Sequence, residues 1–212
     1  MHPAPIYVAY GVQYLIRFVQ SQFPVALDHR VLALFPKNEV SFDEREIKAI
    51  LAFLNSSWSQ IQAEVKGRVA GGVALLELDV GPLSDFLVLD VKKLEEKSVS
   101  KLASLFDKLE AEARRIGGAD IKENSIKLFD TVIKEIDHAI AEILNVSELV
   151  AEGLRTMVKL LMERRLARAE EARRGMIKGR EEEEILEIST PKKRRIRRKA
   201  EEEKAASLND YL

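Results

Sequence analysis

Residues 51–68 read LAFLNSSWSQIQAEVKGR, an apolar helical pattern interrupted by three small polar residues, Asn55, Ser56 and Ser57. Apolar side chains recur at helical spacing on both sides of this interruption, at Ile47, Ile50, Leu51, Leu54, Trp58 and Ile61. Polar groups cost free energy in a core unless they have partners. The interruption therefore has two interpretations: these groups bond neighbouring backbone, or they face a ligand.

The helical pattern has recognisable limits. Ser41 and Asp43 are both N-cap candidates, and Ser41 with Glu44 three residues later has the spacing of a capping box. The pattern ends near Gly67, and a turn is predicted at residues 71–72. Five runs of β-branched, aromatic and aliphatic residues predict strands at 6–10, 14–19, 31–35, 73–78 and 86–89.

Further helices are predicted from about residue 91 onward. The first ends at Gly117 and Gly118, the second follows the apolar spacing from Ile126 to Ile143, and the third starts near Ser147. Short connections between them favour antiparallel packing.

The net charge of −1 combines two unlike regions. Residues 1–150 hold 17 Lys and Arg against 22 Asp and Glu, whereas residues 151–212 hold 17 against 13. From about residue 176 acidic and basic blocks alternate, and such blocks bury too little apolar surface to offset the entropy of ordering. A disordered charged tail is therefore predicted there.

These patterns predict an α+β protein, with a small antiparallel sheet and a packed helix followed by an antiparallel helical bundle and the charged tail. The expected divisions are an α+β recognition-like domain over 1–92, a helical region over 93–175 and a flexible tail over 176–212 with a terminal peptide motif.

Composition excludes several classes of protein. The chain has no cysteine and only three histidines, so disulfide scaffolds, cysteine nucleophiles and cysteine-based metal sites are excluded and no metal site is expected. His29 fits a solvated turn, and His138 fits a packed or surface position. No long apolar run or leader-like N-terminus occurs, so a cytoplasmic protein without membrane contact is expected.

The order of elements resembles the C-terminal, target-recognition side of adenine-specific N6 DNA methyltransferases of restriction–modification systems. The resemblance covers about residues 7–170. The residues that carry it are the Leu54–Ser57 pattern, Glu64, Gly67, Arg68, Gly71, Gly72 and the Leu87–Asp90 element. It also extends through the helical residues 105–120 and 128–137.

The sequence departs from that family in its catalytic half. It has neither the Asn/Asp-Pro-Pro-Tyr/Phe motif nor the glycine-rich loop for S-adenosylmethionine, and none of its six prolines are adjacent. We therefore expect no catalytic residues and no cofactor in this chain, which is not catalytic alone. The resemblance implies that S-adenosylmethionine belongs to a catalytic methyltransferase subunit, if one exists, with which this chain associates.

The resemblance and the charge pattern together imply contact with duplex DNA. Basic side chains bind phosphates without sequence preference. The residues expected at the DNA or partner face are Asn55, Ser57, Lys66, Arg68, Gly71, Gly72, Lys192, Lys193, Arg194, Arg195, Arg197, Arg198 and Lys199. Two alternatives stay open, since the glycine pair also fits a plain turn and the basic run also fits a solvated tether.

The last residues suggest a different function. Leu208, Tyr211 and Leu212 have the spacing of the sliding-clamp-binding peptide of archaeal and eukaryotic replication proteins, although Ala205 replaces its usual glutamine. One 3₁₀-like turn would bring the three apolar side chains to one side. The alternative prediction is thus an adaptor that binds a sliding clamp through this peptide.

Overall fold

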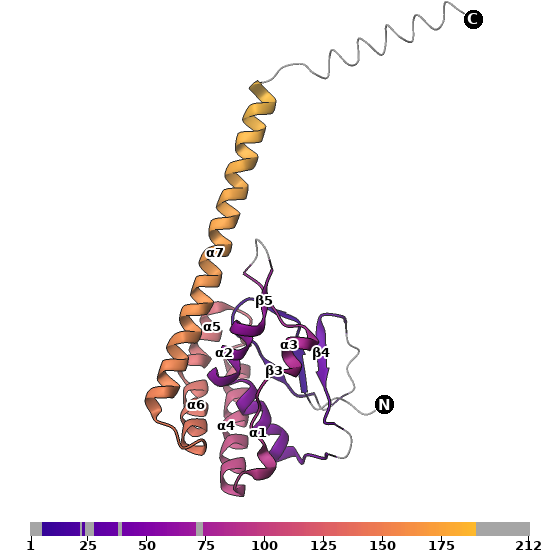
Figure 1. The fold of residues 1–212 in the computed structure, drawn as a ribbon, viewed down its shortest axis with the longest axis vertical. Helices are drawn as coiled ribbons and strands as arrows, with labels where there is room; N and C mark the ends of the chain where they lie inside the picture. Colours follow the sequence, from indigo (N-terminus) through magenta and orange to yellow (C-terminus); the bar gives the residue numbers. More distant parts are fainter. Residues whose placement is uncertain (1–5, 22, 24–27, 38–39, 71–73, 190–212) are drawn as a thin grey trace, which may run out of the picture. The chain divides into compact units, whose positions relative to one another are not determined.

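The computed structural model describes residues 6–21, 23, 28–37, 40–70 and 74–189, and their side chains as far as residue 177. The chain divides into two compact units, residues 1–169 and residues 170–212. The first unit contains all the strands that the structure describes (Figure 1).

The strands form two small antiparallel sheets. One has the order β3 (Phe18–Val19), β1 (Ile6–Ala9), β4 (Val31–Leu34), and the other has the order β2 (Gly11–Val12), β6 (Leu76–Glu77), β5 (Arg68–Val69). Tyr7 lies opposite Val19 on one side and Ala33 on the other, so β1 is the central strand of the first sheet.

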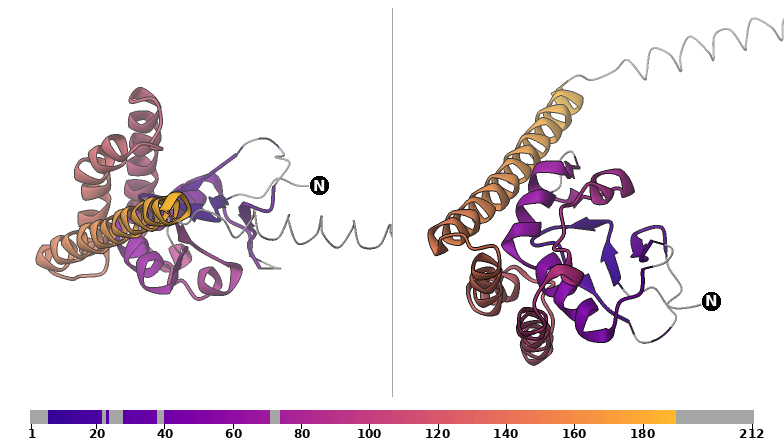
Figure 2. Two further views of the ribbon diagram at one scale, coloured as in Figure 1. Left: turned by 90° about the horizontal axis from the view of Figure 1, so that it is seen from above. Right: turned by 60° about the horizontal axis from the view of Figure 1, so that its bottom comes forward.

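Eight helices follow the first four strands in the described part of the chain. They are α1 (Glu44–Leu54), α2 (Ser57–Lys66), α3 (Val80–Ser84), the 3₁₀ helix η1 (Val91–Lys93), α4 (Glu96–Arg115), α5 (Lys122–Asp130), α6 (Val132–Ile143) and α7 (Glu148–Ser189). Helix α1 lies between the strands and helices α4 and α6 (Figures 1 and 2). The predicted α+β class is confirmed.

Helix α1 begins two residues later than a cap at Ser41 would place it. Asp43 is its N-cap and accepts from the Glu46 backbone N–H at 2.8 Å, while the Glu46 carboxylate accepts from the Asp43 backbone N–H at 2.8 Å. This reciprocal pair satisfies two of the N–H groups that a helix start leaves without partners. The other predicted N-cap, Asp43, is thus confirmed.

Two predicted strands differ from the structure. The run at 14–19 is a strand only at Phe18–Val19, because Tyr14 and Leu15 lie in a bend. The run at 86–89 is not a strand, since both backbone groups of Leu87 bond the Gln62 side chain.

The predicted helix from Ile126 to Ile143 is two helices. They are separated at Thr131, whose backbone has φ −114° and ψ −95°, outside helical values. Phe129 at the end of α5 and Ile133 at the start of α6 both lie in the core.

One core joins the strands to the helices in the first unit. It contains Phe18 from β3, Leu51 from α1, Leu76 from β6, Leu102 from α4 and Ile136 from α6, all almost completely buried. The predicted end of α4 is confirmed, because Gly117 and Gly118 follow it with φ values of 80° and 99°.

Helix α7 continues past the predicted start of the charged tail at residue 176 and ends at Ser189. Residues 176–189 include five glutamates, with Met176, Lys178, Arg180 and Leu186 among the other strong helix formers, so local propensity supports a helix without a core to pack against. The second unit, in its described part, consists of the continuation of this helix from Glu170.

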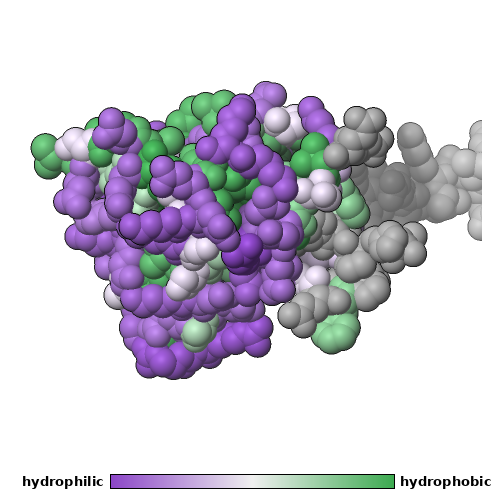
Figure 3. Space-filling view, turned by 90° about the horizontal axis from the view of Figure 1, so that it is seen from below, coloured by the Kyte–Doolittle hydropathy of each residue, from purple (hydrophilic) through white to green (hydrophobic). Residues whose placement is uncertain are grey.

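Hydrophilic residues cover most of the face in Figure 3, with apolar residues gathered along part of its edge. Exposed apolar side chains of the first unit include Leu144, Val146, Leu149 and Val150 around the α6–α7 turn. Among the described residues, no helix combines the length and apolar character needed to cross a membrane.

Gly67, the most closely packed of the glycines that the structure describes, gives a direct test of the packing between α2 and the second sheet. A Cβ on Gly67 would lie 2.7 Å from the Ala63 carbonyl oxygen and 2.7 Å from Leu76 Cδ1. We expect Gly67→Ala to lower the free energy of unfolding by about 1–3 kcal/mol, the usual cost of overpacking.

The matched control is Gly153→Ala in α7, where an added Cβ meets nothing within 4 Å. It should raise the free energy of unfolding by about 0.5–1 kcal/mol through helix propensity. Urea unfolding of both variants measures the difference, and equal midpoints would contradict the packing described for Gly67.

Candidate nucleic-acid interface

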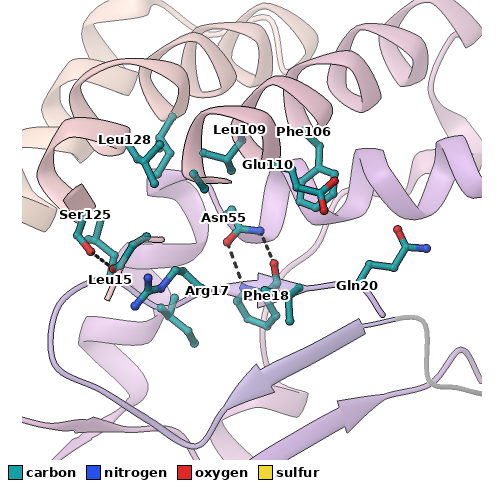
Figure 4. A pocket seen from close by; sticks show the side chains of 15 residues that line it. Leu15, Arg17, Phe18, Gln20, Asn55, Phe106, Leu109, Glu110, Ser125 and Leu128 are labelled. Atoms are coloured by element: carbon teal, nitrogen blue, oxygen red, sulfur yellow. Dashed lines mark hydrogen bonds between the residues drawn. The ribbon is translucent and has the colours of Figure 1, made fainter. Parts of the chain in front are cut away.

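Asn55 lies in the interior and bonds the backbone of strand β3. Its Oδ1 accepts from the Phe18 N–H at 3.1 Å, and its Nδ2 donates to the Phe18 carbonyl at 2.9 Å and to the Leu51 carbonyl at 2.9 Å (Figure 4). Only 5% of the residue is exposed. The carboxamide thus pairs with Phe18 as a neighbouring strand would.

Two further carboxamides of the same stretch act in the same way. Gln60 accepts from the Ile16 N–H at 2.9 Å and donates to the Ile16 carbonyl at 2.7 Å, and Gln62 makes the equivalent pair with Leu87 at 2.7 and 3.0 Å. Ile16 and Phe18 are alternate residues, so their outward backbone groups point to the same edge. Asn55 and Gln60 therefore cover an edge that would otherwise be open to another strand.

Ser57 also bonds within the protein rather than outward. Its backbone N–H and its Oγ each donate to a different oxygen of the Asp137 carboxylate, at 2.7 Å. Ser56 is the N-cap of α2 by position but makes no side-chain cap bond, since its Oγ donates to the Phe53 carbonyl. Asp137 of α6 therefore caps α2, where a negative charge is favoured by the helix dipole.

Asp137 is completely buried and is shared with α7. Arg155 donates from Nη1 to the Asp137 carboxylate at 2.9 Å and from Nη2 to the Phe129 carbonyl at 2.7 Å. Burial raises the pKa of the Asp137 carboxyl above its usual value, while the hydrogen bonds from Ser57 and Arg155 act in the opposite direction. Ser57, Asp137 and Arg155 form one network, called here the buried triad.

These contacts decide between the two interpretations of the polar interruption. The structure supports backbone bonding for Asn55, and the Ser57 hydroxyl and N–H are both occupied by Asp137. Their burial removes both from any surface that DNA could reach in this conformation. The sequence-based assignment of Asn55 and Ser57 to a DNA face is therefore corrected to a structural role.

Lys66 and Arg68 are exposed, in contrast. The Lys66 ammonium donates to the Asp85 carbonyl and lies 6.0 Å from the centre of the Phe86 ring, and it has no ion pair with any residue that the structure describes. Arg68 on β5 pairs with Glu77 on β6 at 2.6 Å, and 71% of its side chain stays exposed.

A buried arginine of α7 anchors that helix beside the same region. Arg165 bonds the Glu64 carboxylate of α2 at 2.8 Å, and it also donates to the backbone carbonyls of Ala74 and Tyr14, the latter at 3.0 Å. Only 3% of its side chain is exposed. Glu64 lies two residues before Lys66, so α7 is held near the end of α2 that leads into β5.

Two neighbours of Arg165 on α7, Arg164 and Arg168, point outward. Both are exposed, and among the described residues neither has an ion pair. We call Lys66, Arg68, Arg164 and Arg168 the basic cluster.

Several sequence-predicted residues lie outside the described residues. They are Gly71 and Gly72, the basic run Lys192, Lys193, Arg194, Arg195, Arg197, Arg198 and Lys199, and the peptide residues Leu208, Tyr211 and Leu212. Their roles at DNA or a sliding clamp stay predictions from the sequence.

Two histidines of the described part of the chain, His29 and His138, take part in surface contacts. His29 pairs with its neighbour Asp28, and His138 Nε2 lies 2.9 Å from Glu152. Among the described residues, no group of three or more histidine and acidic side chains is arranged to hold a metal ion.

In comparisons with known proteins, no protein-family model, curated protein or solved structure matches the chain. The assignment of residues therefore depends on their contacts and exposure in this structure.

The buried triad gives a second prediction. We expect Asp137→Ala to lower the free energy of unfolding by about 3–5 kcal/mol, because it removes the buried carboxylate that pairs with Arg155 at 2.9 Å and leaves only the more distant carboxylates of Asp130 and Glu152, at 3.4 and 3.7 Å. The single variant Arg155→Met completes the comparison. In the double variant Asp137→Ala, Arg155→Met, the loss of unfolding free energy should be about 0.5–3 kcal/mol smaller than the sum of the losses in the two single variants.

The control pair is Arg114 and Glu110, whose ion pair at 2.6 Å is exposed. Arg114→Met should change stability by less than about 0.5 kcal/mol. Chemical denaturation of the four variants measures these values, and additive losses for Asp137 and Arg155 would contradict the network.

Proposed function

We propose that this protein is a DNA-associated recognition or partner-docking module of an N6-adenine DNA methyltransferase or restriction–modification system. It supplies contacts to the DNA backbone, while methyl transfer belongs to a separate catalytic subunit that binds S-adenosylmethionine. The proposal is supported by the resemblance over residues 7–170 and by the basic cluster.

The observation that carries the proposal is the anchoring of α7 by Arg165. The bonds of this residue to Glu64 and to the Ala74 carbonyl bring exposed arginines of α7 to the end of α2 where β5 begins. The four exposed cations of the basic cluster thus lie on three elements of the first unit, with Arg165 holding α7 at Glu64 and the Lys66 side chain directed to Asp85, about 160° around α2 from Glu64.

Phosphate is the chemistry that suits this cluster. Lys66 is held by a carbonyl rather than by a carboxylate, and Arg164 and Arg168 have no acidic partner among the described residues. A phosphate can therefore bind them without first breaking an ion pair. Arg68 is the exception, because a phosphate must compete there with Glu77. Such contacts position a protein on a duplex and carry no base specificity.

The DNA part of the proposal is tested by fluorescence anisotropy with the full chain and a labelled duplex over a range of KCl concentrations. We expect the logarithm of the affinity to fall linearly with the logarithm of the salt concentration. Replacing the four residues of the basic cluster with glutamine should reduce that slope by about 0.9 for each phosphate that the variant no longer neutralises.

A charge-matched control replaces four exposed cations elsewhere with glutamine: Lys93, Lys97, Arg114 and Arg115. This variant should keep a slope close to that of the unchanged protein. An equal reduction of the salt slope in both variants would show that only net charge matters. Binding that is insensitive to salt would contradict the proposal.

The partner part requires a separate test. If the neighbouring upstream reading frame encodes the Asn-Pro-Pro-Tyr motif and a cofactor loop, its product should co-purify with this chain and methylate adenine in DNA only in the complex. Failure of the two to associate would leave the DNA contacts standing and contradict the methyltransferase assignment.

A further inference from the structure

A small cavity opens between the segment that leads into β3 and the helices α4 and α5. Its volume is about 140 Å³. Apolar side chains line most of it, and Figure 4 shows Phe106, Leu109 and Leu128 of the helices facing the segment that carries Phe18. It is separate from the basic cluster.

The polar groups at the base of the cavity already have partners. The Asn55 carboxamide is used by Phe18 and Leu51, and the Ser125 Oγ donates to the Ala119 carbonyl at 2.6 Å. Asn55 and Ser125 thus present no unpaired polar atom to the cavity, and although the Gln20 carboxamide also lines it, the mostly apolar surface suits a hydrocarbon group.

The size of the cavity limits that group. An engineered protein cavity of about 150 Å³ lined by Leu, Ile and Phe holds one benzene molecule. A space of about 140 Å³ therefore matches one six-membered aromatic ring or a branched aliphatic chain.

The wall of the cavity contains one incompletely paired cation. The side chain of Arg17 is 31% exposed, and its ion pair with Asp120 at 3.2 Å is made to a carboxylate that is 93% exposed. Burial lowers the pKa of the Arg17 guanidinium, and the pair with Asp120 acts against that shift. Because Asp120 is so exposed, its ion pair with Arg17 contributes little to stability.

The other carboxylate of the cavity lining competes little with a ligand for Arg17. Glu110 also lines the cavity, but its carboxylate is bound to Arg114 at 2.6 Å. A second carboxylate that approached Arg17 could form a bidentate pair with the planar guanidinium, which is shorter and stronger than a single contact.

We propose that this cavity binds a small carboxylate that carries one aromatic ring or branched aliphatic group. The apolar group fills the space between Leu109 and Leu128, and the carboxylate replaces Asp120 as the partner of Arg17. This binding is independent of the DNA contacts proposed above.

The test is a titration of the full chain with 3-phenylpropionate and with its neutral amide, 3-phenylpropanamide, followed by methyl NMR. Binding of the carboxylate should shift the methyl signals of Leu109, Leu128 and Ile133, which line the cavity. The amide should bind the same site with an affinity at least about tenfold lower, because it lacks the charge-assisted bond to Arg17.

Three variants separate the parts of the proposal. Arg17→Gln should weaken the carboxylate about tenfold and leave the amide unchanged. Asp120→Asn removes the competing carboxylate from an exposed position and should tighten 3-phenylpropionate binding severalfold. Ala113→Leu places a larger side chain in the cavity wall and should abolish binding of both compounds.

Each other result overturns the proposal. Equal binding of the carboxylate and the amide would mean that the cavity takes a neutral group, such as an apolar side chain of a partner protein. Binding that survives Ala113→Leu, or no shift of the three methyl signals, would show that the cavity is not the site. Weaker binding in Asp120→Asn would show that Arg17 does not exchange partners.

Discussion

The break between α1 and α2 at Asn55 and Ser56 is the constraint on which the rest of the structure depends. Successive residues of an α-helix are about 100° apart, so in one unbroken helix Asn55 and Gln60 would point in directions about 140° apart. The break lets both carboxamides reach alternate residues of one extended segment, Ile16 and Phe18. It also frees the first N–H of α2, at Ser57, for the Asp137 carboxylate.

Two buried arginines then attach α7 to this arrangement. Arg155 joins it to α6 through Asp137, and Arg165 joins it to α2 through Glu64 and to the turns around Tyr14 and Ala74. Buried ion pairs add little net stability compared with well-packed apolar groups, but breaking one is costly. Their value here is positional, because they fix which side of α7 faces the core and which side presents Arg164 and Arg168.

The sequence predicted the α+β class, the apolar face of α1 and the glycines that end α4, all of which follow from local rules on spacing and capping. It did not predict the partners of Asn55, Ser57 and Gln60, because those bonds join residues far apart in the chain. The importance of Asp137 was also hidden, since one acidic residue beside His138 on a helix resembles an ordinary surface carboxylate. The sequence left both interpretations of Asn55 and Ser57 open, because it does not show the distant groups that they bond.

The proposed DNA surface follows from this arrangement, since Arg165 positions α7 only if α2 begins where the break places it.

Hydrogen exchange by NMR tests the break most directly, because the amides of Ile16, Phe18 and Ser57 bond side chains rather than another strand or helical turn. The account predicts that these three amides exchange as slowly as core amides of α4 such as that of Leu102. Exchange as fast as in exposed loops would contradict it.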